Sequence, residues 1–276
     1  MKKFSAFTLA EVLITLGIIG VVAAMTMPNL IANYQKKSVV NRLRKMYAVT
    51  KQAVLLSKVD NDEVSGWDWE LAENDIYGFT KKYFAPYFKG SQIYKGNDFD
   101  KITDHKYSIK NLSNKIITGL NSKEYAIIIL LDGSYFIAKE RHNTGYEWLY
   151  IDINGLSGPN RIAKDIFVLN MTPDYYYNRI RNAEIIFWME GSSREVLTNS
   201  GPQEDEKNYG YYGCSKNNKY GYYSGYACGA LIQADGWKIS EDYPWQKTKI
   251  ITRLKAVGSI TPRAKELYKT STPHQH

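Results

Sequence analysis

The hydrophobic positions begin as one long apolar run and then become periodic. Between Ala6 and Ile31 the chain is apolar apart from a few small polar residues and one carboxylate, Glu11. A transmembrane helix needs about 20 mainly apolar residues. The pattern therefore predicts a membrane-spanning helix over residues 7–30.

Beyond Pro28 the apolar residues recur at spacings of three and four, which is one stripe of an amphipathic helix. The stripe consists of Val39, Val40, Leu43, Met46, Tyr47, Thr50, Ala53 and Val54. We expect a single helix from Phe7 to about Lys58, on the order of 75 Å long at 1.5 Å per residue. Its second part, residues 31–58, should pack on a head domain. Pro28 should kink or loosen it, because proline lacks a backbone donor.

Residues 59–270 are expected to form this globular head, and residues 271–276 a frayed tail. A polar break at 60–66 ends the long helix. A second helical region is expected over 67–88, and the segment 89–121 is polar and rich in turns.

Strands are expected farther along the chain. Residues 125–138 are β-branched and aromatic around Asp132-Gly133, a strong hairpin signal. Residues 147–153 and 185–189 supply two further strands. These elements predict an α+β fold, with a long N-terminal helix packed on a head that contains a small antiparallel sheet.

Glu11 is the unusual residue of the apolar run, because hydrocarbon cannot solvate a carboxylate. Such a residue either stays neutral in lipid or has a charged partner. A plain membrane anchor would not need it. An ordinary signal peptide has an apolar core of about 7–15 residues, and this run is longer.

The segment Phe7-Thr8-Leu9-Ala10-Glu11 follows a short basic leader and resembles the N-terminus of type IV pilins and type II secretion pseudopilins. The resemblance covers about the first 55 residues. It implies that a prepilin peptidase removes residues 1–6 by cutting between Ala6 and Phe7, and that the new Phe7 amine is methylated. Ala6 departs from the family, in which this residue is usually Gly. Pro28 matches a helix-loosening proline of many type IV pilins.

The same resemblance implies that Glu11 pairs with the Phe7 amine of a neighbouring subunit in a helical filament. It also implies contact with the inner membrane and an assembly platform. The head should lie outside the cytoplasm of a bacterial cell, and later in a pilus or pseudopilus. Basic residues after the span outnumber Lys2 and Lys3, which by itself favours a cytoplasmic head. The leader and the cysteines favour the opposite, and long domains translocate regardless of charge.

The chain contains only two cysteines, Cys214 and Cys228. In an exported protein such a close pair usually forms a disulfide. The Tyr- and Gly-rich segment around them, 209–228, resembles the disulfide-bounded C-terminal loop of type IV pilins. Its tyrosines either contact proteins and glycans or cover a small sheet.

The segment 152–165 carries several oxygen side chains on a loop rich in Gly and Pro. Asp152, Asn154, Asn160 and Asp165 could surround Ca²⁺, which prefers six to eight oxygens, and some pseudopilins carry a calcium loop. The spacing does not fit the twelve-residue helix-loop-helix pattern. The alternative is a tight turn in which Asn and Asp cap the backbone.

The chain has 36 Lys and Arg against 28 Asp and Glu, for a net charge of +8. The basic residues are scattered among acids, which favours solubility over DNA binding. His105 and His142 lack a recognisable catalytic context, and no phosphate-binding loop or small-molecule site is evident. We therefore expect a non-enzymatic filament subunit, minor rather than major given its large head. The alternatives are a membrane-tethered binding module that uses its Tyr-rich head, or a DNA-uptake pilin, which salt-sensitive DNA binding would reveal.

Overall fold

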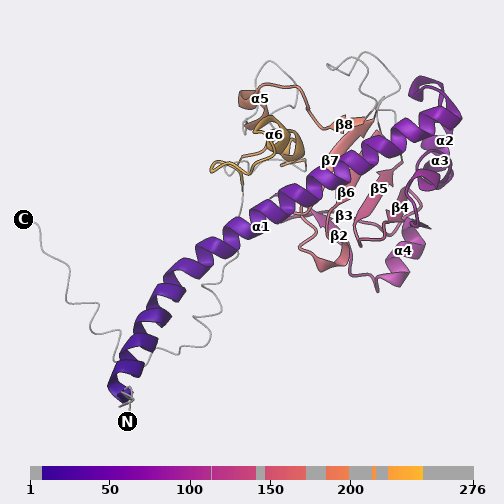
Figure 1. The fold of residues 1–276 in the computed structure, drawn as a ribbon. Helices are drawn as coiled ribbons and strands as arrows, with labels where there is room; N and C mark the ends of the chain where they lie inside the picture. Colours follow the sequence, from indigo (N-terminus) through magenta and orange to yellow (C-terminus); the bar gives the residue numbers. More distant parts are fainter. Residues whose placement is uncertain are drawn as a thin grey trace, which may run out of the picture. The chain divides into compact units, whose positions relative to one another are not determined.

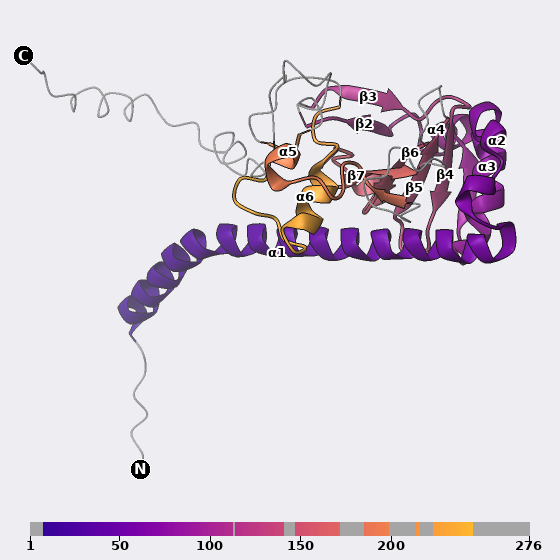
Figure 2. The ribbon, with the colours of Figure 1, turned by 90° about the horizontal axis from the view of Figure 1, so that it is seen from above.

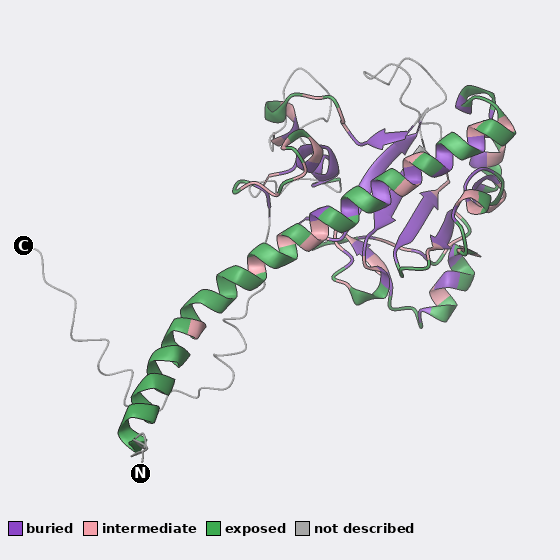
Figure 3. Ribbon diagram, in the orientation of Figure 1, coloured by how far each residue is buried: buried purple, intermediate pink, exposed green. Residues whose placement is uncertain are grey.

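The computed structural model describes residues 8–112, 114–140, 147–171, 185–198, 213–215 and 223–244. The long helix α1 spans Leu9–Asn61, close to the expected bounds. No described residue before Val40 is buried, whereas from Val40 onward one stripe of α1 lies against the head (Figures 1 and 3). The buried residues of α1 are Val40, Leu43, Met46, Tyr47, Thr50, Ala53, Val54 and Ser57. The amphipathic stripe is thus confirmed.

Pro28 lies inside α1 and cannot donate a hydrogen bond to the preceding turn. Figure 2 shows α1 bending in its N-terminal half, the half that contains this proline. A kink at Pro28 itself stays a prediction.

The head is built on one six-stranded antiparallel sheet with the strand order β1-β4-β5-β6-β7-β8. The strands are β1 Gln92–Lys95, β4 Tyr125–Ile129, β5 Tyr135–Lys139, β6 Glu147–Asp152, β7 Ile166–Met171 and β8 Ile185–Phe187. A separate pair contains β2 Ser108–Lys110 and β3 Ile116–Gly119. The α+β fold class is confirmed, and the expected hairpin is β4–β5, with Gly133 at a φ of 81° in its turn.

Short helices surround the sheet. They are η1 Val64–Gly66, α2 Trp69–Asn74, α3 Ile76–Tyr83, η2 Ala85–Tyr87, α4 Gly96–Ile102, η3 Gly155–Ser157, α5 Arg194–Thr198 and α6 Cys228–Ala234. The helical region expected over 67–88 is therefore two α-helices, interrupted at Asp75, whose φ of −148° is not helical.

Two segments differ from the sequence-based expectation. The turn-rich stretch 89–121 contains β1, α4, β2 and β3. Strand β1 is a half-buried edge strand whose pairing with β4 defines it. Strand β7 was not expected at all. Its residues are all buried, so its pattern lacks the alternation of apolar and polar residues by which a half-buried strand is found.

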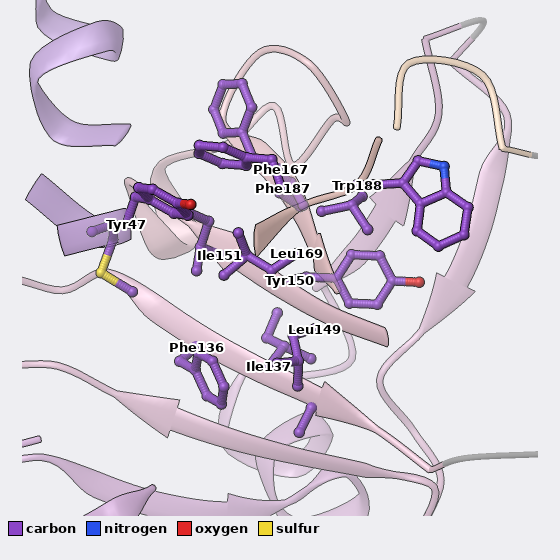
Figure 4. Close-up of a cluster of buried hydrophobic side chains, with 14 of the residues drawn as sticks. Tyr47, Phe136, Ile137, Leu149, Tyr150, Ile151, Phe167, Leu169, Phe187 and Trp188 are labelled. Carbon is purple, nitrogen blue, oxygen red and sulfur yellow. The ribbon is translucent and has the colours of Figure 1, made fainter. Parts of the chain in front are cut away.

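Both faces of the sheet are covered. On one face, Phe136 of β5 packs on Phe84 with a centroid distance of 4.8 Å, and Phe187 of β8 stacks on Tyr47 of α1 at 4.2 Å. Figure 4 shows Tyr47 within this cluster. On the other face, Tyr135 of β5 contacts Phe99 of α4.

Tyr47 connects α1 to the C-terminal part of the head. Its hydroxyl donates to Glu190 Oε2 at 2.7 Å, the same oxygen accepts from the Phe187 N–H, and Gln233 of α6 donates to Oε1. The Trp237 ring lies 6.0 Å from the Tyr47 ring. Burial and this hydrogen bond raise the pKa of Tyr47 far above its ordinary value, so the hydroxyl remains a donor at physiological pH.

Candidate functional site

The N-terminal half of α1 is the first candidate site. It is long and apolar enough to cross a membrane, and no part of its apolar window is buried. Leu13, Ile14 and Ile18 are among its exposed side chains. So large an exposed apolar surface marks a membrane or protein contact, and a core helix of a soluble protein would be covered instead.

Glu11 takes part in capping the N-terminus of this helix. Thr8 is the N-cap, and its backbone N–H and hydroxyl both donate to Glu11 Oε2 at 2.8 Å. The Glu11 N–H donates back to Thr8 Oγ1 at 3.3 Å. This reciprocal arrangement is a capping box, which satisfies two backbone donors that the helix leaves unpaired. Ala6 and Phe7 lie outside the described residues.

The capping role was missed in the sequence, although its signal, Thr followed three residues later by Glu, is present. Thr8 is thus a local partner of Glu11, in addition to the neutral state and the charged partner expected from the sequence. Both hydrogen bonds use Oε2. Within the described part of the chain no hydrogen bond to Oε1 is recorded, so capping leaves that oxygen available for a second partner.

The second candidate site is the loop after β6, and it brings the four expected oxygen residues together. Asp152 Oδ1 accepts from the N–H groups of Asn154 and Gly155 at 3.0 and 2.8 Å. Asp165 accepts from the Asn160 and Arg161 N–H groups at 2.9 and 2.7 Å. Both carboxylates therefore hold the backbone of the loop, as the tight-turn alternative expects.

Tyr107 makes a further contact to this loop, which sequence reasoning did not find. Its buried hydroxyl donates to Asp152 Oδ2 at 2.6 Å. Burial raises the pKa of Asp152 to about 7, although the Tyr107 hydroxyl and the loop N–H groups favour the charged form. Burial also raises the pKa of Asp165, against its hydrogen bonds from Arg161 and Asn160.

Two amide oxygens of the loop, Asn154 Oδ1 and Asn160 Oδ1, are buried without a hydrogen-bond partner. Such oxygens are the kind of ligand that Ca²⁺ takes. Among the described residues, however, no group of three or more His, Cys, Asp or Glu could hold a metal ion. The loop thus offers oxygens for calcium but no dense carboxylate cage.

The expected disulfide joins Cys214 and Cys228, with a Cα–Cα distance of 4.8 Å. Within the enclosed segment, Tyr226 is buried and its hydroxyl lies 3.2 Å from that of Tyr150 on β6. Tyr223 is partly exposed and packs edge-on against Tyr226. Of the tyrosines described in this segment, Tyr226 therefore covers the sheet, whereas Tyr223 is exposed. Residues 209–212 and 216–222 lie outside the described part of the chain.

His105 does not form a catalytic arrangement. Its exposed ring pairs with Asp100 at the end of α4. His142 lies outside the described residues.

Comparison with known protein families gives one match for the N-terminal segment and one for the rest of α1 and the head. A model described as a family of unknown function (DUF6613) matches residues 29–247. The chain belongs to this family. A second model, the prokaryotic N-terminal methylation motif, matches residues 1–27. No curated protein and no solved structure matches the chain.

The methylation motif is the signature of type IV pilins and pseudopilins, so the expected resemblance is confirmed. This DUF6613 chain is a pilin-like or pseudopilin-like protein. The motif implies processing by prepilin peptidase and assembly with other pilin subunits, and it indicates a structural subunit anchored in a membrane. The two matches leave only Pro28 between them, so the motif ends where the family-specific part begins.

The contact of Tyr107 with Asp152 gives a pH-dependent prediction. We expect Tyr107→Phe to destabilise the protein by about 1–3 kcal/mol, because a buried acceptor loses its donor. The folded pKa of Asp152, about 7, exceeds its ordinary value of 3.8. Stability therefore falls as pH rises between these values. Losing the hydroxyl raises this pKa further, so the destabilisation should be larger at pH 8 than at pH 5.

The measurement is the free energy of unfolding of the full chain in detergent at both pH values. Tyr125→Phe is the control, because the Tyr125 hydroxyl donates to the neutral Thr118 hydroxyl at 2.9 Å. Its cost should not change with pH. An equal cost of Tyr107→Phe at pH 5 and pH 8 would show that Asp152 does not change its charge in this range.

Proposed function

We propose that this protein is a structural subunit, minor rather than major, of a type IV pilus or type II secretion-like filament. Prepilin peptidase cuts after Ala6, the Phe7 amine is methylated, and the subunit waits in the bacterial membrane with its head outside the cytoplasm. The observation that carries the proposal is the methylation motif at residues 1–27, which runs directly into a helix whose first half is apolar and uncovered.

Several features of the head are consistent with this function. Among the described residues, the buried ones of α1 all lie in its second half, from Val40 onward, and the exposed first half is available for a bilayer and later for other helices. The disulfide suits a head that folds outside the cytoplasm. The large size of the head favours a minor position, because each copy occupies much of the filament surface.

Processing is the first test of the proposal. We expect mass spectrometry of the mature protein to find Phe7 at its N-terminus, carrying one methyl group. Ala6→Gly should be cut at least as completely, because Gly is the usual family residue at this position. An intact Met1, or a cut within Ala23-Ala24-Met25, would contradict the proposal and favour an ordinary anchor or signal peptide.

Glu11 provides the second test, and the capping box supplies its control. Glu11→Gln retains an oxygen that can accept from the Thr8 N–H and hydroxyl, but it removes the negative charge. Glu11→Val removes both the cap and the charge. If the charge pairs with a neighbouring Phe7 amine, each variant leaves that amine unpaired, which costs about 3–5 kcal/mol per buried pair.

We therefore expect both variants to remain in the membrane but to be lost from filaments sheared off the cells. The measurement is the subunit content of the sheared fraction relative to the membrane fraction. If Glu11→Gln enters filaments as well as the wild type while Glu11→Val does not, Glu11 acts only as a cap. Normal incorporation of both variants would favour the membrane-tethered binding module.

Calcium binding by the loop after β6 stays a prediction. Asp152, Asn154, Asn160 and Asp165 would hold the ion, and the two unpartnered amide oxygens favour this arrangement. Extracellular calcium modules have dissociation constants of about 0.1–1 mM. If the loop is such a site, calcium at about 10 mM should raise the Tm of the full chain above its value in chelator.

Magnesium should not reproduce this rise, since it requires a tighter octahedral shell. Asp165→Asn should abolish it, whereas Asp98→Asn, at an exposed acid of α4, should retain it. A Tm that is the same in calcium and in chelator would leave the loop with its capping role alone.

A further inference from the structure

The charges of α1 and of the segment after it are segregated. From Val12 to Val59 the chain has no acidic residue and seven basic ones, Lys36, Lys37, Arg42, Arg44, Lys45, Lys51 and Lys58. From Asp60 to Asp75 it has no basic residue and seven acidic ones, Asp60, Asp62, Glu63, Asp68, Glu70, Glu73 and Asp75. The head-bearing part of α1 is thus positive, and the segment that begins at its C-terminal end is negative.

Some of the basic residues of α1 make ion pairs or ring contacts within the subunit, and others do not. Lys45 pairs with Asp132, and Lys58 pairs with Glu63. Arg44 and Lys51 lie over the rings of Trp237 and Tyr47. For Lys37 and Arg42, both exposed, no ion pair is recorded within the described residues.

The side of α1 that faces away from the head carries these residues together with apolar ones. This outward face consists of the exposed residues Tyr34, Lys37, Asn41, Arg42, Lys45, Ala48, Gln52, Leu55, Leu56 and Val59. Leu55 is 57% exposed and Val59 is 81% exposed. From Tyr34 to Val59 the face is first aromatic, then basic and then apolar, and the acidic segment 60–63 follows it. Figure 3 shows exposed residues along this helix.

These two ends are complementary if two copies lie parallel with a stagger of about 22 residues, or about 33 Å along the helix. Leu56 of one copy then lies beside Tyr34 of the other. Asp60 and Glu63 lie within the turns that carry Lys37 and Arg42. This stagger therefore brings Leu56 to Tyr34 and the acids at 60 and 63 to the turns of Lys37 and Arg42, and it also brings Lys58 to the position of Lys36.

We infer that the acidic segment 60–63, where α1 ends, in one copy of this chain docks on the basic stretch of α1 in a second copy. The inference rests on the proposed function, because it concerns the contact between successive subunits of a filament. Since the two patches differ, the contact is heterologous, and it can repeat indefinitely without closing. It gives the filament an axial register in addition to that supplied by Glu11.

A second copy of the chain fits more of the outward face of α1 than an anionic lipid surface does. Headgroups could pair with Lys37 and Arg42, which follow the apolar segment directly. They would leave the exposed side chains of Leu55 and Val59 uncovered, because these lie about 20–33 Å farther along the helix. A copy of the chain satisfies both ends at once.

The test is a charge reversal and exchange in the full chain, in cells that assemble it. The basic-end variant is Lys37→Glu with Arg42→Glu, and the acidic-end variant is Asp60→Lys with Glu63→Lys. Each places like charges together at the contact, so each should lower the subunit content of sheared filaments about tenfold or more. Combining all four changes restores opposite charges and should return the content to within about threefold of the wild type.

Lys115→Glu with Lys123→Glu is the matched control, because it makes the same charge change at exposed residues away from α1. It should not affect incorporation. The Tm of every variant in detergent should stay near that of the wild type, which excludes misfolding as the cause.

Cross-linking tests the stagger itself. Tyr34→Cys combined with Leu56→Cys should give a ladder of covalent multimers in filaments under mild oxidation. Tyr34→Cys combined with Ala48→Cys should not, because those positions differ by only 14 residues.

The outcomes separate the possibilities. Loss of incorporation in the basic-end variant alone, with no rescue by the combined variant, would indicate lipid binding and overturn the inference. Wild-type incorporation of both single-end variants would also overturn it while leaving the proposed function intact. Absence of the wild-type chain from filaments would overturn the proposed function and this inference together.

Discussion

The burial of one stripe of α1 against the sheet is the interaction on which the rest of the structure depends. Tyr47 shows how it works: its ring stacks on Phe187, and its hydroxyl reaches Glu190, which also binds the backbone of β8 and Gln233 of α6. One residue of α1 therefore contacts both the sheet edge and the disulfide-linked C-terminal part. A fully buried aromatic side chain stabilises a fold by about 1.5–3 kcal/mol, and the hydrogen bonds make the docking position specific.

Because the same helix continues uncovered beyond the head, docking also determines what is left exposed. Among the described residues none before Val40 is buried, and the exposed apolar surface of the N-terminal half of α1 is of the kind that a bilayer or neighbouring helices cover. Glu11 lies in this uncovered part, and its capping bond to Thr8 reduces the cost of keeping a carboxylate there. The cap uses only Oε2, so it is compatible with the subunit pairing that we propose for Glu11.

In the loop after β6, buried carboxylates stabilise the backbone by accepting hydrogen bonds from its N–H groups. Asp152 and Asp165 each accept two N–H groups of the loop, and these bonds offset part of the cost of burying two carboxylates near one another. Tyr107 adds the third donor to Asp152 from the β2–β3 side of the head. The loop is therefore held by the same groups that a metal ion would use.

The sequence alone determined the features that depend on local pattern. The amphipathic stripe of α1 and the Asp132-Gly133 hairpin follow from spacing and turn chemistry, and the structure contains both. The methylation motif is likewise a short contiguous signal, and the family comparison confirms it. The capping box of Thr8 and Glu11 is also a local feature, because Thr followed three residues later by Glu predicts it from the sequence alone.

Only the tertiary structure decided the features that depend on distant partners. Strand β7 is buried on both faces, so its residues carry no alternation, and its pairing with β6 and β8 defines it. The edge strand β1 exists because β4 pairs with it. Tyr107 reaches Asp152 across 45 residues of sequence, and Tyr47 reaches Glu190 across 143. A local sequence pattern indicates the hydrophobic period of a helix or strand and the residues that cap its ends. Contacts between residues far apart in the sequence form only when the chain folds into its tertiary structure.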